Sequence, residues 1–275
     1  MKQWEELTFS DDYMFKLVLR NEDLCTGFIE RIMRCPVAKI SYINEEKVLQ
    51  PNYDGKGVRV DVYVGNSEEV FDLEMQMWNS GLLMLAKRSR YYQAAMDIDM
   101  LKRGDSYTKL KHSYIVFICP FDIFEQGRHL YTFKNFCQED KNLSLNDERA
   151  IMFLNTHGTM NDVPSELLAL CDYINGKYTD DALVRKIDDE IKHVKSMQKE
   201  RMSYMTYAMK LEDMRAMGRA EGINLGRAEG RLEVLLTSIK NLMDNVGFSL
   251  EQAINVVGAN DEEKARCLAA LNAQK

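Results

Sequence analysis

Alternating polar and apolar residues mark the segment 58–77 and predict two strands joined by a tight turn. Every second residue of each arm is apolar, and we expect these positions to face the core. The polar positions on the opposite face are Arg59, Asp61 and Tyr63 in the first arm and Asp72, Glu74 and Gln76 in the second. Pairing the two arms antiparallel would therefore gather several acids onto one small surface.

Other patterns along the first 160 residues predict helices alternating with strands. The expected helices cover 10–34, with a possible break near 21–23, and 82–101; the expected strands cover 39–49, 112–119, 130–136 and 149–155, and 51–57 reads as a turn. The run 112–119 is apolar enough for a central strand buried on both faces. This order indicates an α/β fold in which helices flank a mixed sheet.

The chain after Pro164 is expected to be helical, over 165–174 and from 179 to about 231. Within the second helix, glycines recur at 218, 222, 226 and 230. Each glycine costs about 1 kcal/mol relative to alanine inside a helix. Close approach of a second copy could offset this cost and would make the protein a homo-oligomer. A solvated linker helix explains the pattern equally well.

The pattern divides the chain into three parts: a core over 1–160, a helical extension over 161–231 and a small helical tail over 232–275. In the tail, the sequence Ser249-Leu-Glu-Gln252 has the form of a capping box. A further helix is expected to begin near Asn260.

Composition narrows the class of protein. Hydrophobic residues make up 45% of the 275 positions and charged residues 29%, so a sizeable core is available. The net charge of −7 means that any binding of a polyanion needs a local basic patch. Six scattered cysteines, an N-terminus without an apolar run, and no apolar stretch of bilayer length favour a cytoplasmic protein without membrane contact.

The acids of the predicted hairpin suit a site for Mg²⁺, or for Mn²⁺ in its place. A hard cation of this kind prefers carboxylate, carbonyl and water oxygens, and it activates water for phosphodiester hydrolysis. Asp61 and Glu74 are the candidate ligands, with the backbone carbonyl of Met75 as a third. Gln76 shares the face of Glu74 and could orient the attacking water. The alternative is that these acids are solvated charges on an exposed strand face.

The helix expected after the hairpin carries the densest basic cluster near these acids, Lys87, Arg88 and Arg90. Lys87 and Arg90 are candidate contacts for DNA phosphates. The alternative is an ordinary charged helix face.

Asp61, a turn and Glu74-x-Gln76 before a basic helix resemble the core of PD-(D/E)XK nucleases, and in particular the PD-(D/E)XK nuclease family transposases, or recombination-promoting nucleases. The segment Phe9-Ser-Asp-Asp-Tyr-Met-Phe-Lys16 resembles the N-terminal signature of that group and places an auxiliary acid at Asp12. The resemblance implies a restriction-endonuclease-like sheet with a long helical C-terminal extension. It also implies a Mg²⁺-dependent DNA endonuclease, with DNA as the partner.

Two positions depart from the superfamily pattern. Gln76 stands where a lysine is usual, and Val60 rather than proline precedes Asp61. Without that lysine, Arg88 or Lys87 would have to supply the cation. The alternative function is a catalytically degenerate nuclease fold that acts as a DNA- or protein-binding module.

Overall fold

We describe a computed structural model of the chain, which covers all residues except 1, 46, 50–56 and 273–275. The chain forms two compact units, Met1–Tyr204 and Met205–Lys275. The turn predicted at 51–57 falls, apart from Gly57, outside the described residues. The first unit contains the sheet and all the candidate site residues.

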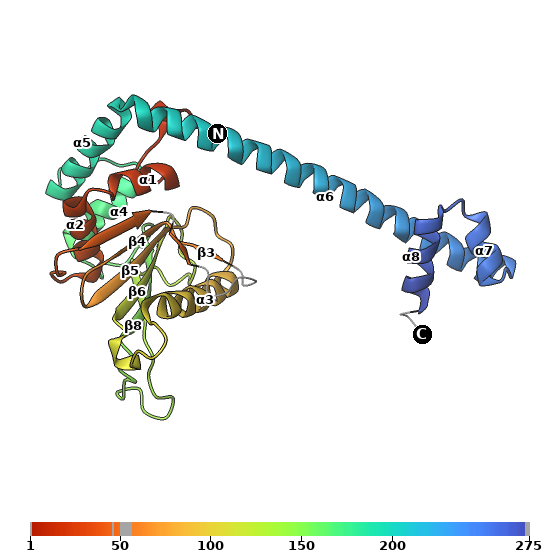
Figure 1. The fold of residues 1–275 in the computed structure, drawn as a ribbon, viewed down its shortest axis with the longest axis horizontal. Helices are drawn as coiled ribbons and strands as arrows, with labels where there is room; N and C mark the ends of the chain where they lie inside the picture. Colours follow the sequence, from red (N-terminus) through yellow and green to blue (C-terminus); the bar gives the residue numbers. More distant parts are fainter. Residues whose placement is uncertain (1, 46, 50–56, 273–275) are drawn as a thin grey trace. The chain divides into compact units, whose positions relative to one another are not determined.

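A six-stranded mixed sheet forms the centre of the first unit, with strand order β1-β4-β5-β6-β8-β7 (Figure 1). The strands are β1 (Tyr42–Glu45), β4 (Val62–Gly65), β5 (Glu69–Met75), β6 (His112–Cys119), β7 (Leu130–Phe133) and β8 (Arg149–Asn155). β5, β6 and β8 run parallel, whereas β1 with β4, β4 with β5, and β7 with β8 are antiparallel. The prediction of a buried central strand at 112–119 is confirmed, because β6 lies between two parallel neighbours.

The first arm of the predicted hairpin is broken rather than continuous. β3 (Val58–Arg59) pairs with β2 (Val48–Leu49) in a separate two-stranded sheet, and only β4 joins the main sheet. The chain changes sheet between Arg59 and Val62, which reorients the side chains. Val58 and Val60 therefore pack in the same hydrophobic cluster as Tyr63, although the alternation placed them on opposite faces. The strand predicted over 39–49 is likewise two short strands, because β1 pairs with β4 in the main sheet whereas β2 pairs with β3 in the separate sheet.

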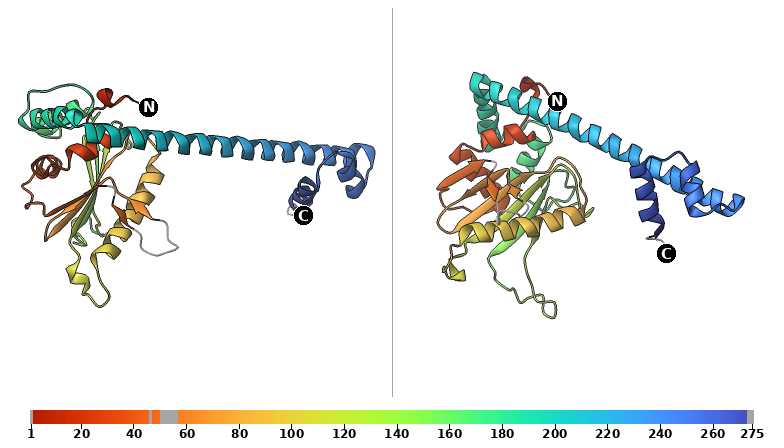
Figure 2. Two further views of the ribbon diagram at one scale, coloured as in Figure 1. Left: turned by 45° about the horizontal axis from the view of Figure 1, so that its top comes forward. Right: turned by 45° about the vertical axis from the view of Figure 1, so that its right-hand side comes forward.

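Helices cover both faces of the sheet (Figures 1 and 2). α3 (Leu82–Met100) lies on one face, and on the other lie α1 (Asp12–Val18), α2 (Glu22–Met33), α4 (Ser165–Ile174) and α5 (Ala182–Ser196). Asn21 caps α2 through the amides of Asp23 and Leu24, which explains the break between α1 and α2. Because α3 covers the acidic face of β5, Asp72 and Glu74 are buried. The alternative that the acids of this face are solvated charges is therefore wrong for Asp72 and Glu74.

The single helix predicted from 179 to 231 is two helices. Met197 has an extended backbone (φ −81°, ψ 109°) and separates α5 from α6 (Gln198–Val246). α6 continues past residue 231, and a Cβ built at any of its glycines 218, 222, 226 and 230 would meet no atom within 4 Å. No contact within the described chain therefore requires glycine at these positions.

The second unit holds a small core of its own, made by Leu235, Ile239, Ala253, Ile254 and Cys267. The unit consists of α6 from Met205 onward with α7 (Leu250–Val256) and α8 (Asp261–Asn272). Ser249 and Gln252 form the predicted capping box, and Asn260 caps α8. None of the described helices is long and apolar enough to span a bilayer.

Candidate active site

The candidate site lies where β5 ends and the chain turns toward α3. β5, α3 and β6 form a parallel strand–helix–strand unit, and Glu74 and Met75 are the last two residues of β5. In sheets with parallel strands, ligands bind beyond the carboxyl ends of the strands, where backbone and side-chain groups converge. The position of the acids agrees with this general rule.

Backbone amides hold the carboxylates of Asp61 and Glu74 in place. The amide of Asp61 donates to Oε1 of Glu74 (3.1 Å), and the amide of Met75 donates to Oδ2 of Asp61 (3.2 Å). The antiparallel register of β4 and β5, in which Val62 lies opposite Leu73, brings the two acids to this position. Tertiary structure thus joins the two metal ligands proposed from the sequence.

Arg88 forms an ion pair with Glu74. Its Nη2 lies 3.0 Å from Oε2 of Glu74, and its guanidinium lies over the rings of Phe117 (4.9 Å) and Tyr92 (5.4 Å). The two rings and the carboxylate restrain the position of the cation. The structure therefore brings Arg88 to the acids, as expected for a catalytic cation, while its role in catalysis stays a prediction.

Lys16, the last residue of the N-terminal signature, is a site residue to which the sequence patterns assigned no role. Its side chain is buried, and its ammonium lies 2.8 Å from Oδ2 of Asp12 and 3.1 Å from Oδ1 of Asp61. Asp12 therefore reaches the site through Lys16. The signal that could have found Lys16 is its spacing of four residues from Asp12, which places both on one side of a helix.

Electrostatics show that the site carries more negative charge than its own cations balance. The site contains four acids, Asp12, Asp61, Asp72 and Glu74, and two cations, Lys16 and Arg88. If all six groups were ionised, the net charge of the site would be −2. Burial, with the nearby charge of Asp12, raises the pKa of Asp61 to about 6. The cluster thus favours binding of protons or of a cation.

The pKa values of Glu74, Asp72 and Lys16 are also shifted. Burial and then neighbouring carboxylates raise the pKa of Glu74 and of Asp72 well above their ordinary values. Burial alone would lower the pKa of Lys16, but Asp61 and Asp12 outweigh it, so the net shift is upward. Asp72 is fully buried on the same strand face as Glu74.

Gln76 follows β5 and is largely buried. Its amide nitrogen donates to the carbonyl of Trp78 (2.5 Å), and its backbone amide donates to Ile118 (2.8 Å). The side chain thus braces the turn that leaves β5. Its proposed function of orienting a water molecule stays a prediction.

The donor set is compatible with a hard divalent cation. Asp61, Glu74 and the carbonyl of Met75 supply only oxygen, and Mg²⁺ is commonly held by one or two carboxylates plus waters and substrate oxygens. Oδ1 of Asp12 is buried and has no hydrogen-bond partner. A cation would relieve the excess negative charge. Among the described residues, no group of three or more His, Cys, Asp or Glu side chains has the arrangement of a metal centre.

Lys87 and Arg90 are exposed on α3. No ion pair with the site acids involves either residue in the described part of the chain. Arg90 lines a cavity of about 210 Å³ together with Lys134 and Arg149. Basic side chains therefore continue along this side of the unit, and contact with DNA phosphates stays a prediction.

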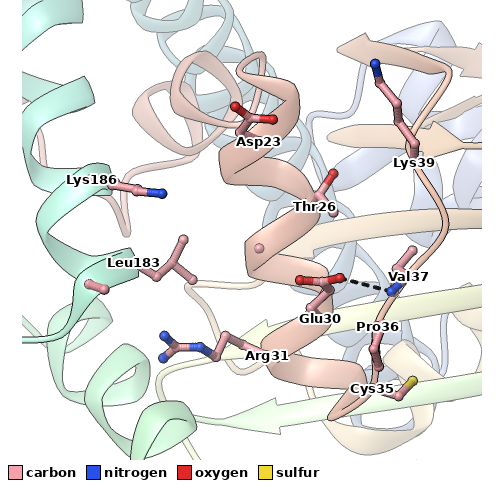
Figure 3. Close-up of a pocket in the computed structure, with 12 residues that line it drawn as sticks. Asp23, Thr26, Glu30, Arg31, Cys35, Pro36, Val37, Lys39, Leu183 and Lys186 are labelled. Carbon is pink, nitrogen blue, oxygen red and sulfur yellow. Dashed lines mark hydrogen bonds between the residues drawn. The ribbon is translucent and has the colours of Figure 1, made fainter.

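A cavity lies away from these residues, between α2, residues 35–39 and α5 (Figure 3). It measures about 840 Å³ and has Lys39 and Lys186 at its rim. Within it, Glu30 accepts a hydrogen bond from the amide of Val37 (3.1 Å). None of the site residues proposed from the sequence lines it.

Comparison with known proteins gives one match. Residues 9–217 match the sequence model of the PD-(D/E)XK nuclease family transposases. This span includes Asp12, Lys16, Asp61, Glu74 and Arg88 and covers well over half of the chain. No curated protein and no solved structure matched significantly. The match agrees with the resemblance carried by the hairpin and by the N-terminal signature.

Proposed function

Because the chain belongs to the PD-(D/E)XK nuclease family transposases, which supports a nuclease-type function, we propose that it is a Mg²⁺-dependent DNA endonuclease. One observation carries the proposal. Asp61 and Glu74 lie together at the carboxyl end of β5, Glu74 buried and Asp61 partly buried, and the backbone amides of Asp61 and Met75 donate hydrogen bonds to their carboxylates. Nucleases of this superfamily typically use divalent metals, and Asp61, Glu74 and the Met75 carbonyl would hold Mg²⁺ or Mn²⁺.

Each residue of the site has a separate task in this proposal. The bound metal would polarise the scissile phosphate and make water a better nucleophile near neutral pH. Lys16 keeps Asp61 in place and links Asp12 to it. Arg88 presents a positive charge beside Glu74 that can stabilise negative charge on the phosphate, the task of the lysine that Gln76 replaces.

The test is a plasmid-cleavage assay with Mg²⁺ on the full chain and on Asp61→Asn and Glu74→Gln. These variants keep the shape of the side chains but lose the charged ligand, so we expect cleavage to fall at least about 100-fold, in line with the several kcal/mol that a catalytic metal supplies. Asp180→Asn is the matched control, because that side chain is 84% exposed in its pair with Arg185. Cleavage unchanged in both site variants would refute the assignment.

A second candidate is a nuclease fold that binds DNA or protein without cutting. It is favoured by the fact that Lys16 and Arg88 already contact one oxygen each of Asp61 and Glu74. These two cations already neutralise part of the negative charge that a metal ion would otherwise balance. Calorimetric titration with Mn²⁺ separates the two candidates: heat of binding that Asp61→Asn abolishes supports the nuclease, and its absence in the native chain supports the binding module.

Assembly into a homo-oligomer through α6 is part of the same proposal. Its support is the set of four glycines that no contact within the described chain requires. Replacing glycines 218, 222, 226 and 230 by alanine would block close approach of a second helix. A fall in mass by sedimentation equilibrium is the expected result, and an unchanged mass would argue against association at this stripe.

A further inference from the structure

The segment immediately after β5 exposes an unusual run of large apolar side chains. These are Met77 (37%), Trp78 (80%), Leu82 (44%), Leu83 (69%) and Met84 (59%). Single exposed apolar residues are ordinary, whereas several close together are typical of a surface that binds a ligand or another macromolecule. The group adjoins the candidate active site.

Trp78 is tied to the strand that carries the acids. The side chain of Gln76 donates to the carbonyl of Trp78 (2.5 Å). This hydrogen bond restrains the backbone of Trp78, two residues after Gln76. Gly81, at φ +87°, then turns the chain into α3, a conformation that other residues rarely adopt. The indole is therefore presented to solvent from a restrained backbone next to Glu74 and Met75.

Charge on this part of the chain is uniformly positive. Between Glu74 and Asp97 every charged residue is basic, namely Lys87, Arg88 and Arg90. The whole chain has a net charge of −7, so this stretch is the exception. Lys87 and Arg90 are exposed and lie within about 12 Å of the start of α3 along its axis. Exposed aromatic and basic side chains in one segment are typical of surfaces that bind single-stranded nucleic acid.

We propose that Trp78, Lys87 and Arg90, here called the Trp78 surface, bind DNA with unpaired bases and select single-stranded or branched DNA over intact duplex. Trp78 stacks on an unpaired base beside the phosphate to be cut, and Lys87 and Arg90 contact the backbone. An intact duplex hides the faces of its bases, so it offers Trp78 nothing on which to stack. This inference rests on the proposed function for the identity of the polymer as DNA.

Charge also argues against a second copy of the chain as the occupant. In a symmetric contact the same patch of both copies meets, so that like residues lie near one another. Lys87 and Arg90 of the two copies would then repel each other, whereas DNA phosphates complement them.

Intrinsic fluorescence of the full chain tests the proposal. The chain has two tryptophans, of which Trp4 is 4% exposed and Trp78 is 80% exposed, so quenching by a ligand reports mainly on Trp78. Titrations in EDTA, where metal-dependent cleavage cannot occur, compare a single-stranded oligonucleotide with the same sequence as a blunt duplex. We expect quenching and tighter binding with the single strand only.

Variants assign the preference to Trp78. Stacking contributes about 1–3 kcal/mol per base, so Trp78→Ala should weaken single-strand binding about tenfold or more, with duplex binding unchanged and Trp78→Phe close to the native chain. Tyr107→Ala is the control. Tyr107 is also exposed, but it comes before the first residue of β6, whereas the candidate site lies beyond the last residue of the parallel strand β5. Lys87→Ala with Arg90→Ala should weaken binding of both DNAs and reduce its dependence on salt.

Several outcomes would overturn the proposal. The first is that Trp78→Ala binds single strands as tightly as the native chain, or loses affinity for duplex to the same extent. The second is that the native chain binds neither DNA. The third is a fall in the mass of Trp78→Ala by light scattering, which would assign the surface to a second copy. Failure of the proposed nuclease is distinguishable from these. A chain that cuts no DNA but whose affinity for a fluorescently labelled single strand, measured by anisotropy, falls in Trp78→Ala retains this inference, whereas normal cutting of single strands by Trp78→Ala rejects it and retains the nuclease.

Discussion

The acidic site and the middle of α6 each contain residues that lower stability, namely acids removed from water in the site and glycines inside the helix. Only in the site do other groups of the chain offset this cost. Burying Asp72 and Glu74, and partly burying Asp61, is unfavourable, and Lys16, Arg88 and backbone amides offset part of that cost. The glycines of α6 also cost stability, yet no neighbour within 4 Å repays it. The cost is thus partly offset within the chain at the site, whereas no described contact of α6 offsets the cost of its glycines.

The largest effect should come from removing the internal cation of the site. Lys16→Met leaves Asp12 and Asp61 without their ion pair, so we expect a loss of about 3–5 kcal/mol in the free energy of unfolding, measured by urea denaturation. The control is Lys177→Met, whose exposed pair with Asp172 should contribute less than about 1 kcal/mol. Similar losses in both variants would mean that the site is not compensated as described.

The pH dependence of stability gives the next largest effect. The pKa of Asp61 is raised to about 6 in the fold, so its contribution is fully present below the unfolded pKa, about 4, and is lost as pH rises through about 6. We expect the contribution of Asp61 itself, roughly 2–3 kcal/mol, to be lost across this window in the metal-free chain. Thermal unfolding in EDTA measures it, and Asp61→Asn should flatten the profile. A profile equally steep in that variant would remove Asp61 as the cause.

The smallest effect concerns α6. If α6 has no partner, Gly222→Ala should stabilise its helix by up to about 1 kcal/mol, because alanine has the higher helix propensity. Thermal unfolding followed by far-ultraviolet circular dichroism measures this change. A destabilised helix, with a transition that depends on protein concentration, would instead show that a second helix offsets the glycine cost.

Much of the first unit follows from local pattern. The alternation over 69–75, the apolar run 112–119 and the helix starting at 82 all appear where they were expected, because each depends on neighbours in the sequence. The proximity of Asp61 and Glu74 was also predictable, since hairpin register relates two nearby strands. Lys16 was not, because the ion pair with Asp61 joins segments that no local pattern relates.

The sequence alone determined the alternation of helices and strands, the two acids of the hairpin and the basic stretch beyond them. Three further features depended on tertiary structure. The chain switches sheets before Asp61, α3 covers the acidic face of β5, and Lys16 enters the site from α1. Local periodicity specifies which residues share a face of an element, but only packing decides whether that face meets water or another helix. Because burial sets the cost of a charge, packing made these acids a site.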